Sequence, residues 1–443
     1  MFGFKYRQVA CSVLIATALS AVSSFAVTSQ FRGVNWADKR DNFVSDVLVL
    51  SGMSLSDNYQ SASVVAERVI GQFQELLGTN SVRVPVNEPT VSRFFDTYTG
   101  ALDVALKRGR LVMGYWGPAQ PSGPKNMDDW WNMWAKLVEK YGTHPNAYFE
   151  IFNEPHMYNK DQLRNLYATW LEKFPNVPRD HVILDGSGMA QNVPDIADDP
   201  RFEGCLFAVH EYTFWNMSIT TEEGWKNSFK YKVGKYADRT VCTEWGGAMA
   251  PGDKAGVHYE TMDYNSTPTN YFMAYIRGMS DQLREWEMGS FYWPGLRDGD
   301  WYSMTKRSGE GANIKLEVVN QSGLDRMHRA WADTVEIVRD TVRDTVPADT
   351  AVTDSIPADT AVADSDVVVP DSSMAIGMRV QLSNRSPRSF KVFSMTGKLL
   401  GRIEMSGGNS VQDLSAGLKA AGFANGVYLV YGSAGQPVKI SVK

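Results

Sequence analysis

Two short motifs end apolar runs in glutamates, whose carboxylates can act as acids, bases or nucleophiles. The first, at residues 148–156, reads Tyr-Phe-Glu-Ile-Phe-Asn-Glu-Pro-His and places Glu154 before Pro155. Because proline cannot continue a hydrogen-bonded ladder, we expect a strand that ends there. The second, at residues 241–247, reads Val-Cys-Thr-Glu-Trp-Gly-Gly and ends its run on Glu244. Either glutamate alone could be a helix N-cap or a surface charge, so their joint position matters.

Two carboxylates that face each other are the minimum apparatus for cleaving a glycosidic bond. One must be protonated to release the leaving sugar, and the other must be ionised to attack the anomeric carbon. A separation of about 5 to 5.5 Å supports a double displacement that retains configuration. This chemistry requires a fold that brings Glu154 and Glu244 to the same edge.

Eight apolar runs alternate with helical patterns between residues 31 and 331, as in repeated βα units around a parallel sheet. About 300 residues of this pattern suit an α/β fold of the (β/α)8 TIM barrel type, with Glu154 after strand four and Glu244 on strand seven. An open doubly wound sheet is disfavoured, because residues 33–38 after the first strand offer only one glycine for a phosphate loop. The expected strands are residues 32–36, 81–86, 111–116, 147–153, 181–185, 205–212, 240–245 and 289–293. Helices are expected between them, for example at residues 62–77, 127–141, 163–174 and 270–286.

These motifs resemble those of glycoside hydrolase family 5, in the clan of retaining (β/α)8 hydrolases. The resemblance covers roughly residues 31–331 and implies Glu154 as the acid/base and Glu244 as the nucleophile. It implies no cofactor. It rests on residues 153–155 after strand four, 210–212 on strand six, 243–246 on strand seven and 292–293 on strand eight.

The same resemblance implies the substrate-binding residues. Asn153 would bond the sugar 2-hydroxyl, and Arg83 would help keep the nucleophile ionised. His210 and Tyr212 would line the cleavage site, with Tyr212 bonding the nucleophile. Trp293 would form the floor on which the sugar stacks.

The chain departs from the family at the end of strand three. Many members carry a histidine there, whereas residues 114–117 read Gly-Tyr-Trp-Gly. One sugar hydroxyl contact is therefore unassigned. Trp116 is one candidate to supply it, and the polar cluster of Asp38, Arg40 and Asp41 after strand one is the other.

Two other glutamates compete with these assignments. Residues 87–89 also read Asn-Glu-Pro, but they follow strand two, so we expect Glu88 to contact substrate or cap a loop. Glu150 lies four residues before Glu154, on the same face but deeper in the barrel, and is expected to be a buried ion-pair partner.

Strand alternation also places the two cysteines of the mature chain. Cys242 is expected on the face of Glu244, and Cys205 on the face opposite to His210 and Tyr212. This parity argues against a disulfide, so we expect two free thiols.

Aromatic planes bind the apolar faces of sugar rings. We expect Trp130 and Trp134, one helical turn apart, to pack in the core. The tryptophans expected to meet sugar, at strand ends or in the following loops, are Trp116, Trp215, Trp245, Trp293 and Trp301.

Other chemistries fit the sequence less well. The histidines show no His-Glu-x-x-His spacing, so no metal site is expected. No serine has the Gly-x-Ser-x-Gly setting of an esterase. The 443 residues are 21% charged with a net charge of −6, which does not suggest a nucleic-acid binder.

The chain ends differ from the barrel in composition. Residues 1–26 read as a signal peptide, with Lys5 and Arg7 before an apolar run and Ala26 at the cleavage point. The alternative, a membrane anchor, is disfavoured by the short run. The catalytic domain would span residues 27–331. Residues 332–373 carry a charge of −8 and repeat Pro-Ala-Asp-Thr-Ala-Val, as expected for an extended acidic linker.

Residues 374–443 carry a charge of +7, contain no tryptophan and show the alternation of a small antiparallel β module. They resemble the C-terminal secretion domains of Gram-negative proteins exported by the type IX route. A carbohydrate-binding module is the competing interpretation. The sequence thus predicts a monomeric retaining hydrolase of β-linked polysaccharide, secreted or held at the cell surface, with an endo-β-1,4-glucanase favoured. Mannan, xylan or side-chain specificities, and a non-catalytic polysaccharide-binding protein, are the alternatives.

Overall fold

A computed structural model of the chain describes residues 28–117, 124–214, 216–332, 388–394, 399–405, 411–424, 426–431 and 437–442. The chain divides into two compact units, one holding the barrel and one holding the C-terminal module, and each is described by itself. The predicted signal peptide, and the predicted linker apart from Ala332, lie outside the described residues. Within the described residues, no helix combines the length and hydropathy needed to cross a membrane.

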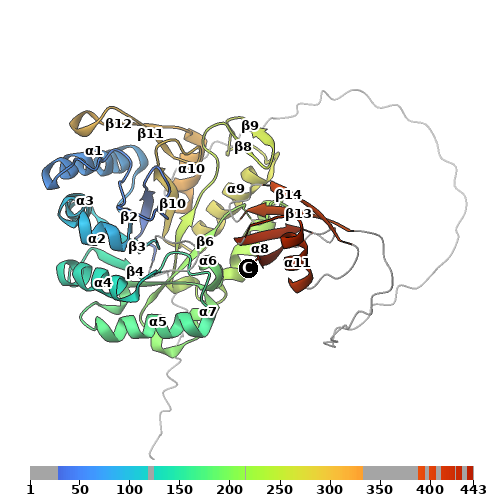
Figure 1. Cartoon of the computed structure of the whole chain (residues 1–443). Coiled ribbons are helices and arrows are strands. Elements are labelled where there is room, and N and C mark those ends of the chain that lie inside the picture. Colours follow the sequence, from blue (N-terminus) through green and yellow to red (C-terminus); the bar gives the residue numbers. More distant parts are fainter. Residues whose placement is uncertain are drawn as a thin grey trace, which may run out of the picture. The chain divides into compact units, whose positions relative to one another are not determined.

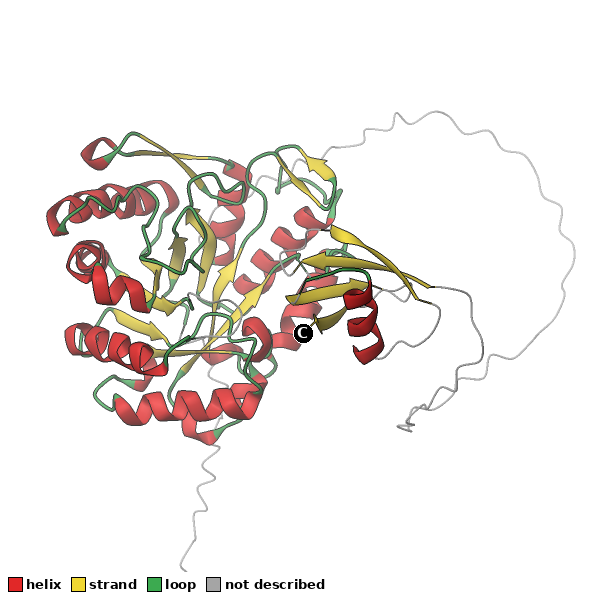
Figure 2. Ribbon diagram, viewed as in Figure 1, coloured by secondary structure: helices red, strands yellow, loops and turns green. Residues whose placement is uncertain are grey.

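Eight parallel strands close into a barrel in the order β1-β10-β7-β6-β5-β4-β3-β2. Figures 1 and 2 show these strands at the centre of the first unit with helices around them. The predicted (β/α)8 barrel is confirmed. Its strands are β1 Arg32–Trp36, β2 Ser81–Val86, β3 Arg110–Tyr115, β4 Ala147–Glu150, β5 Val182–Asp185, β6 Leu206–Glu211, β7 Thr240–Trp245 and β10 Ser290–Leu296.

The helices outside the barrel carry apolar faces that pack on the strands. The longer ones are α1 Tyr59–Leu77, α3 Phe95–Arg108, α4 Met127–Tyr141, α5 Lys160–Lys173, α8 Glu222–Val233, α9 Tyr271–Glu285 and α10 Gln321–Ala330. Trp130 and Trp134 of α4 are fully buried, as predicted. The first unit also includes the short helices α2 Glu88–Arg93, α6 Ser187–Ala190 and α7 Pro194–Ala197, and the hairpin of β11 Thr305–Ser308 with β12 Lys315–Val318. The hairpin of β8 Gly252–Lys254 with β9 Val257–Tyr259 is grouped with the second unit from Asp253 onward.

Strand β4 is shorter than predicted, because it ends at Glu150 rather than Asn153. The chain leaves the ladder after Ile151, whose N–H still donates to Ile183. The Asn153 N–H turns back to the carbonyl of Tyr115 on β3. Glu154 then adopts the left-handed backbone conformation, with φ of 51°. The catalytic candidate therefore lies on a loop just beyond the strand.

A register shift in β7 corrects the predicted orientation of Cys242. Cys242 pairs with Val209 of β6, but Glu244 pairs with the next residue, His210, so Thr243 is the extra residue of a bulge. Paired residues share a face, so Cys242 points away from the face of Glu244, contrary to the alternation argument. Cys205 and Cys242 are both buried and free.

The C-terminal unit contains a helix that the sequence pattern did not reveal. Its antiparallel sheet has the order β14-β13-β15-β16. Helix α11, Val411–Ala420, lies between β14 and β15 in the chain. Leu414 and Leu418, one helical turn apart, join the buried core of the sheet with Val392 and Ile440. The strands are β13 Arg388–Ser394, β14 Leu399–Met405, β15 Gly426–Tyr431 and β16 Pro437–Val442.

A glycine allows the ends of β7 and β10 to approach closely. A Cβ on Gly246 would lie 2.0 Å from the carbonyl oxygen of Trp293, whereas one on Gly247 would lie 3.1 Å from the mobile end of the Ile276 side chain. Gly246→Ala should therefore cost about 1–3 kcal/mol of unfolding free energy, because a backbone carbonyl cannot move aside. Denaturant unfolding of the two alanine variants checks this. An equal or larger loss in Gly247→Ala would contradict it.

Candidate active site

A single buried guanidinium joins four strands or their following loops at the mouth of the barrel. Arg83 of β2 has a fully buried side chain. Its Nε donates to Glu150 of β4, and its Nη1 donates to Glu244 of β7 at 2.7 Å. Nη1 also reaches Asn35 of β1 at 2.8 Å, and Nη2 donates to Asn153. The predicted proximity of Arg83 to Glu244 is present in the structure.

Both oxygens of Glu244 have donors. Besides Arg83 on Oε1, the Tyr212 hydroxyl donates to Oε2 at 2.8 Å. Burial and the neighbouring Glu154 raise the pKa of Glu244, whereas Arg83 and the Tyr212 hydrogen bond oppose that rise. Two donors to one carboxylate stabilise its ionised form. Glu244 thus has the surroundings of an anionic nucleophile.

Glu154 lies opposite, and no lysine or arginine of the described residues bonds it. Burial raises its pKa to about 8, Asp41 and Glu150 add to the rise, and Arg83 opposes it. A carboxylate oxygen of Glu154 lies within 4.8 Å of one of Glu244. At neutral pH the pair therefore holds one protonated carboxyl beside one that is stabilised as the anion.

His210 bridges the two glutamates as a neutral ring. Its Nδ1 lies 3.0 Å from Glu154 Oε1 and 3.6 Å from Glu244 Oε2, and its Nε2 lies 2.9 Å from the Thr243 hydroxyl. Burial lowers the pKa of His210 to about 4. The ring therefore carries one proton at neutral pH and donates from one nitrogen only.

Asn153 keeps a free donor beside the glutamates. Its Oδ1 accepts from Arg83, which fixes the orientation of the amide. Its Nδ2 is buried and has no partner among the described residues. The amide can therefore donate a hydrogen bond to a bound hydroxyl.

Trp116 and Trp293 meet over the barrel mouth. Their rings stack with centroids 5.2 Å apart, and Phe43 packs edge-on against Trp116. The Arg83 guanidinium carbon lies 5.2 Å from the Trp116 ring centroid. Only 2% of Trp116 and 8% of Trp293 are exposed. A sugar can stack on this face of Trp293 only after Trp116 moves.

The polar cluster after β1 has two separate parts. Arg40 bonds both oxygens of the buried Asp38, which also accepts the N–H of Val49, so this pair holds the β1–α1 loop. Asp41 lies 3.6 Å from Arg297 and is close enough to raise the pKa of Glu154. A cavity of about 810 Å³ lies between this loop and the β11–β12 hairpin, but neither catalytic candidate lines it.

The two other candidate glutamates, Glu150 and Glu88, bond to side chains on strands of the barrel. Glu150 is the buried partner of Arg83, and the prediction of a buried ion pair is confirmed. Glu88 is the first residue of α2, which Asn87 caps, and it accepts from the Tyr115 hydroxyl at 2.9 Å. No contact between Glu88 and Glu244 is present among the described side chains.

Two of the remaining tryptophan predictions can be compared with the structure. Trp245 is fully buried against Tyr292 and cannot line a sugar site, so that prediction is wrong. Its ring points from the end of β7 into the helix layer because Glu244 faces the mouth. Trp301 is partly exposed and packs against Phe272 and Tyr302. Trp215 lies outside the described residues.

The sequence analysis assigned no individual role to three residues of this network. Asn35 links β1 to the carbonyls of Thr243 and Tyr292. The Thr243 hydroxyl lies 2.9 Å from Nε2 of His210. Asp185, at the end of β5, accepts the backbone N–H of Glu154 at 2.9 Å. Only the position of Asp185 at a strand end could have suggested it.

Two groups of side chains bring metal-ligand atoms within 4.8 Å of one another: Glu150, Asp185 and His210, and Glu154, His210 and Glu244. Each group contains a carboxylate that already bonds the Arg83 guanidinium. A divalent cation would face that positive charge at short range. These side chains are therefore better suited to hold protons than to bind a metal ion.

A family comparison identifies the barrel. The model of the cellulase family, glycosyl hydrolase family 5, matches residues 47–291, which is more than half of the chain. The chain belongs to glycosyl hydrolase family 5. It is a glycoside hydrolase.

Three solved structures that match this chain share little sequence with it. Cel5A (EG2) from Hypocrea jecorina is 17% identical, with 66% of this chain and 97% of that chain covered and a TM-score of 0.44. The Thermobifida fusca endoglucanase Cel5A catalytic domain is 16% identical, with 68% and 92% covered and a TM-score of 0.44. A Streptomyces thermolilacinus β-mannanase is 16% identical, with 62% and 81% covered and a TM-score of 0.38. A search of curated proteins finds no significant match.

The charge on Asp41 offers a test of the acid. If Glu154 is the acid, kcat/KM should fall as pH rises through about 8, because the protonated form disappears. Asp41→Asn removes a nearby negative charge and should move this alkaline limb to lower pH. Asparagine also tolerates the φ of 82° at this position.

Glu172→Gln, a change on the exposed end of α5, is the matched control for loss of one negative charge and should leave the limb in place. An unchanged alkaline limb in Asp41→Asn would contradict the electrostatic link between Asp41 and Glu154.

Proposed function

We propose that this family 5 enzyme is a retaining hydrolase of β-linked polysaccharide that acts by double displacement, and that its substrate is a cellulose-type β-1,4-glucan cut internally. The observation that carries the mechanism is the separation of the two glutamates. Their nearest ligand atoms lie within 4.8 Å, whereas inverting enzymes need roughly 6.5–9.5 Å to admit a water molecule.

The electrostatics divide the two roles. Glu154, with its raised pKa, donates a proton to the departing glycosidic oxygen while Glu244 attacks the anomeric carbon. Arg83 and Tyr212 hold the attacking carboxylate in position. In the second step Glu154, now ionised, removes a proton from water, and the water oxygen displaces Glu244 from the sugar.

The remaining contacts supply substrate recognition. Asn153 Nδ2 donates to the sugar 2-hydroxyl, since its oxygen is already bonded to Arg83. Trp293 and Trp116 provide aromatic surface once they separate. Trp116 also has a buried indole N–H without a partner among the described residues, which suits the hydroxyl that the family histidine would bind. The cellulase description of the matching family model favours glucan.

Glu244→Gln should abolish hydrolysis, because an amide cannot form the glycosyl intermediate. We expect reducing-sugar release from carboxymethylcellulose, mannan and xylan to be greatest on the glucan, and to fall by at least about a thousandfold in the variant. The Glu172→Gln variant should match wild type. Activity that survives Glu244→Gln, or wild-type inactivity on every polymer, would overturn the proposal.

A different family 5 specificity is the second candidate. The observation that favours it is the tryptophan in place of histidine at the end of β3, which changes one wall of the cleavage site. Greater release from mannan or xylan in the same panel would select it. Loss of polymer viscosity ahead of reducing-sugar release would identify internal cutting.

We also propose that the protein is exported and that its C-terminal unit serves sorting rather than catalysis. The signal-like residues 1–26 and the tryptophan-free module support this assignment. The sheet and helix of the module form a small folded core, as a sorting domain requires.

Deletion of residues 374–443 should leave the enzyme in the periplasm of its Gram-negative host with specific activity intact. Immunoblotting of periplasm and culture medium measures this. The full-length Glu244→Gln protein controls for effects of activity on export and should be released normally. Release of the truncated protein at the normal level would refute the sorting role.

A further inference from the structure

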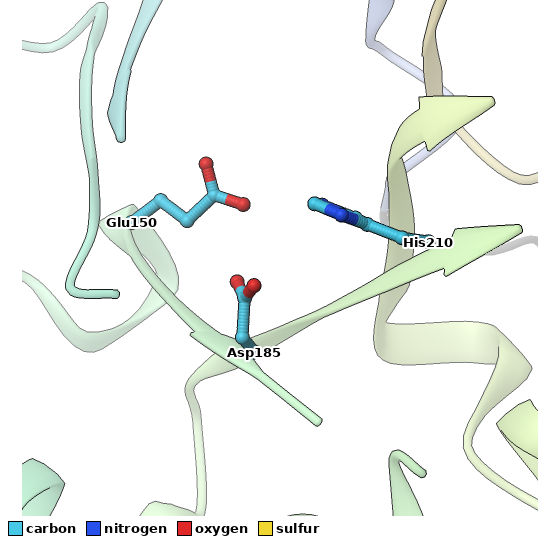
Figure 3. Close-up of side chains that lie close together, drawn as sticks. All are labelled: Glu150, Asp185 and His210. Carbon is cyan, nitrogen blue, oxygen red and sulfur yellow. The ribbon is translucent and has the colours of Figure 1, made fainter. Parts of the chain in front are cut away.

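Asp185 is a buried carboxylate in contact with the catalytic loop but with no role in the steps above. It ends β5, is fully buried and lies with Glu150 and His210 in one cluster. Figure 3 shows the carboxyl groups of Asp185 and Glu150 directed toward each other, with the ring of His210 alongside. Three titratable groups this close together cannot all be charged at low cost, so the protonation state of each must be assigned.

One oxygen of Asp185 anchors the backbone of the acid. Oδ2 accepts the Glu154 N–H at 2.9 Å. That N–H belongs to a residue with φ of 51°, a conformation that costs energy for a non-glycine residue and persists only where its surroundings enforce it. The loop has already left the β4 ladder at this point, so the side chain takes the place of a strand partner.

The other oxygen of Asp185 lacks a donor in the described part of the chain, as does one oxygen of the neighbouring Glu150. Asp185 Oδ1 and Glu150 Oε1 are both buried, and neither has a donor among the described residues. Two oxygens cannot hydrogen-bond without a proton between them, and one shared proton would satisfy both. Glu150 is already paired with Arg83 through Oε2, so the proton belongs on Asp185.

We propose that Asp185 is a positioning residue held as a neutral carboxylic acid, whose protonated Oδ1 donates to Glu150 while Oδ2 holds the Glu154 backbone N–H. The proposal rests on the proposed role of Glu154 as the acid. It connects the loop that carries the acid to the Arg83–Glu150 pair beneath it.

The charged surroundings agree with this proton state. Burial raises the pKa of Asp185 well above its usual range, the negative charge of Glu150 raises it further, and Arg83 opposes the rise. His210 contributes no charge at neutral pH. Tyr167 of α5, which bonds the Asp185 carbonyl at 3.1 Å, also stays neutral because burial raises its pKa.

Asp185→Asn is the sharpest test, because an amide reproduces a protonated acid. Its NH2 can donate to Glu150 and its oxygen can accept from Glu154. We expect kcat/KM within about threefold of wild type and an unchanged pH profile. Asp185→Ala removes both bonds, and kcat on polymer should fall roughly tenfold or more with a smaller change in KM.

The leaving group separates positioning of the acid from general damage. In a 2,4-dinitrophenyl β-glycoside of the preferred sugar, the dinitrophenolate leaves without being protonated. Its kcat/KM should therefore fall much less in Asp185→Ala than the kcat/KM for polymer. Equal losses on both substrates would overturn the proposal. So would an Asp185→Asn enzyme as impaired as Asp185→Ala.

Stability provides a measurement that does not depend on activity or on the alanine variant. A carboxyl with a raised folded pKa binds a proton on folding, so wild-type stability is lost as pH rises above the unfolded value near 4. The Asp185→Asn variant has no carboxyl at this position, so its stability does not decrease with pH for this reason. The unfolding constant of wild type relative to Asp185→Asn should therefore rise by up to tenfold per pH unit above about pH 4. A ratio that does not change with pH would refute the neutral acid.

These outcomes are distinct from failure of the proposed function. If wild type cleaves no glycan, or Glu244→Gln remains active, the enzymatic role fails while the stability measurement still decides the proton state of Asp185. If wild type is active and Glu244→Gln is not, only the Asp185 results bear on the positioning role.

Discussion

The active site depends on one buried guanidinium. Arg83 is fully enclosed, and a buried cation is tolerated only when its charge and donors are matched. Glu150 and Glu244 supply the charges, and Asn35 and Asn153 supply further acceptors. The geometry of Glu244, the proposed nucleophile, is thereby coupled to the packing of β1, β2, β4 and β7. Gly114 on β3 leaves the space, because a Cβ there would lie 2.8 Å from Glu150.

The same cation sorts the carboxyl groups around it into two kinds. Glu150 bonds Arg83 directly and its pKa is lowered, whereas Glu154 and Asp185 do not bond Arg83 and their pKa values are raised by burial. Glu244 lies between these cases, because burial raises its pKa while its bond to Arg83 opposes the rise. Burial penalises every charge here, and contact with the guanidinium offsets part of that penalty for Glu150 and Glu244. An acid and a nucleophile can therefore coexist within 4.8 Å at one pH.

Much of this site could be predicted from sequence because its motifs fall at strand ends. The barrel, the strand positions of Arg83 and Glu244, and the ion pair of Glu150 all follow from periodicity and spacing. The bulge at Thr243 could not be predicted, since it adds one residue to a ladder without any glycine or proline to mark it. Cys242 consequently faces the other side. The turn at Glu154 depends on Asp185, 31 residues later, which local propensity does not register.

The end of β3 shows how one substitution reshapes the site around this framework. An imidazole there would offer a smaller ring with two nitrogens for hydrogen bonds, whereas the Trp116 indole packs on Arg83, stacks on Trp293 and is itself covered by Phe43. Aromatic packing over a cation offsets part of the cost of burying that charge. It also fills the space beside Trp293 that a sugar would need. A sugar that stacks on Trp293, as proposed above, would therefore exchange the indole contact of Trp116 for a contact of its own.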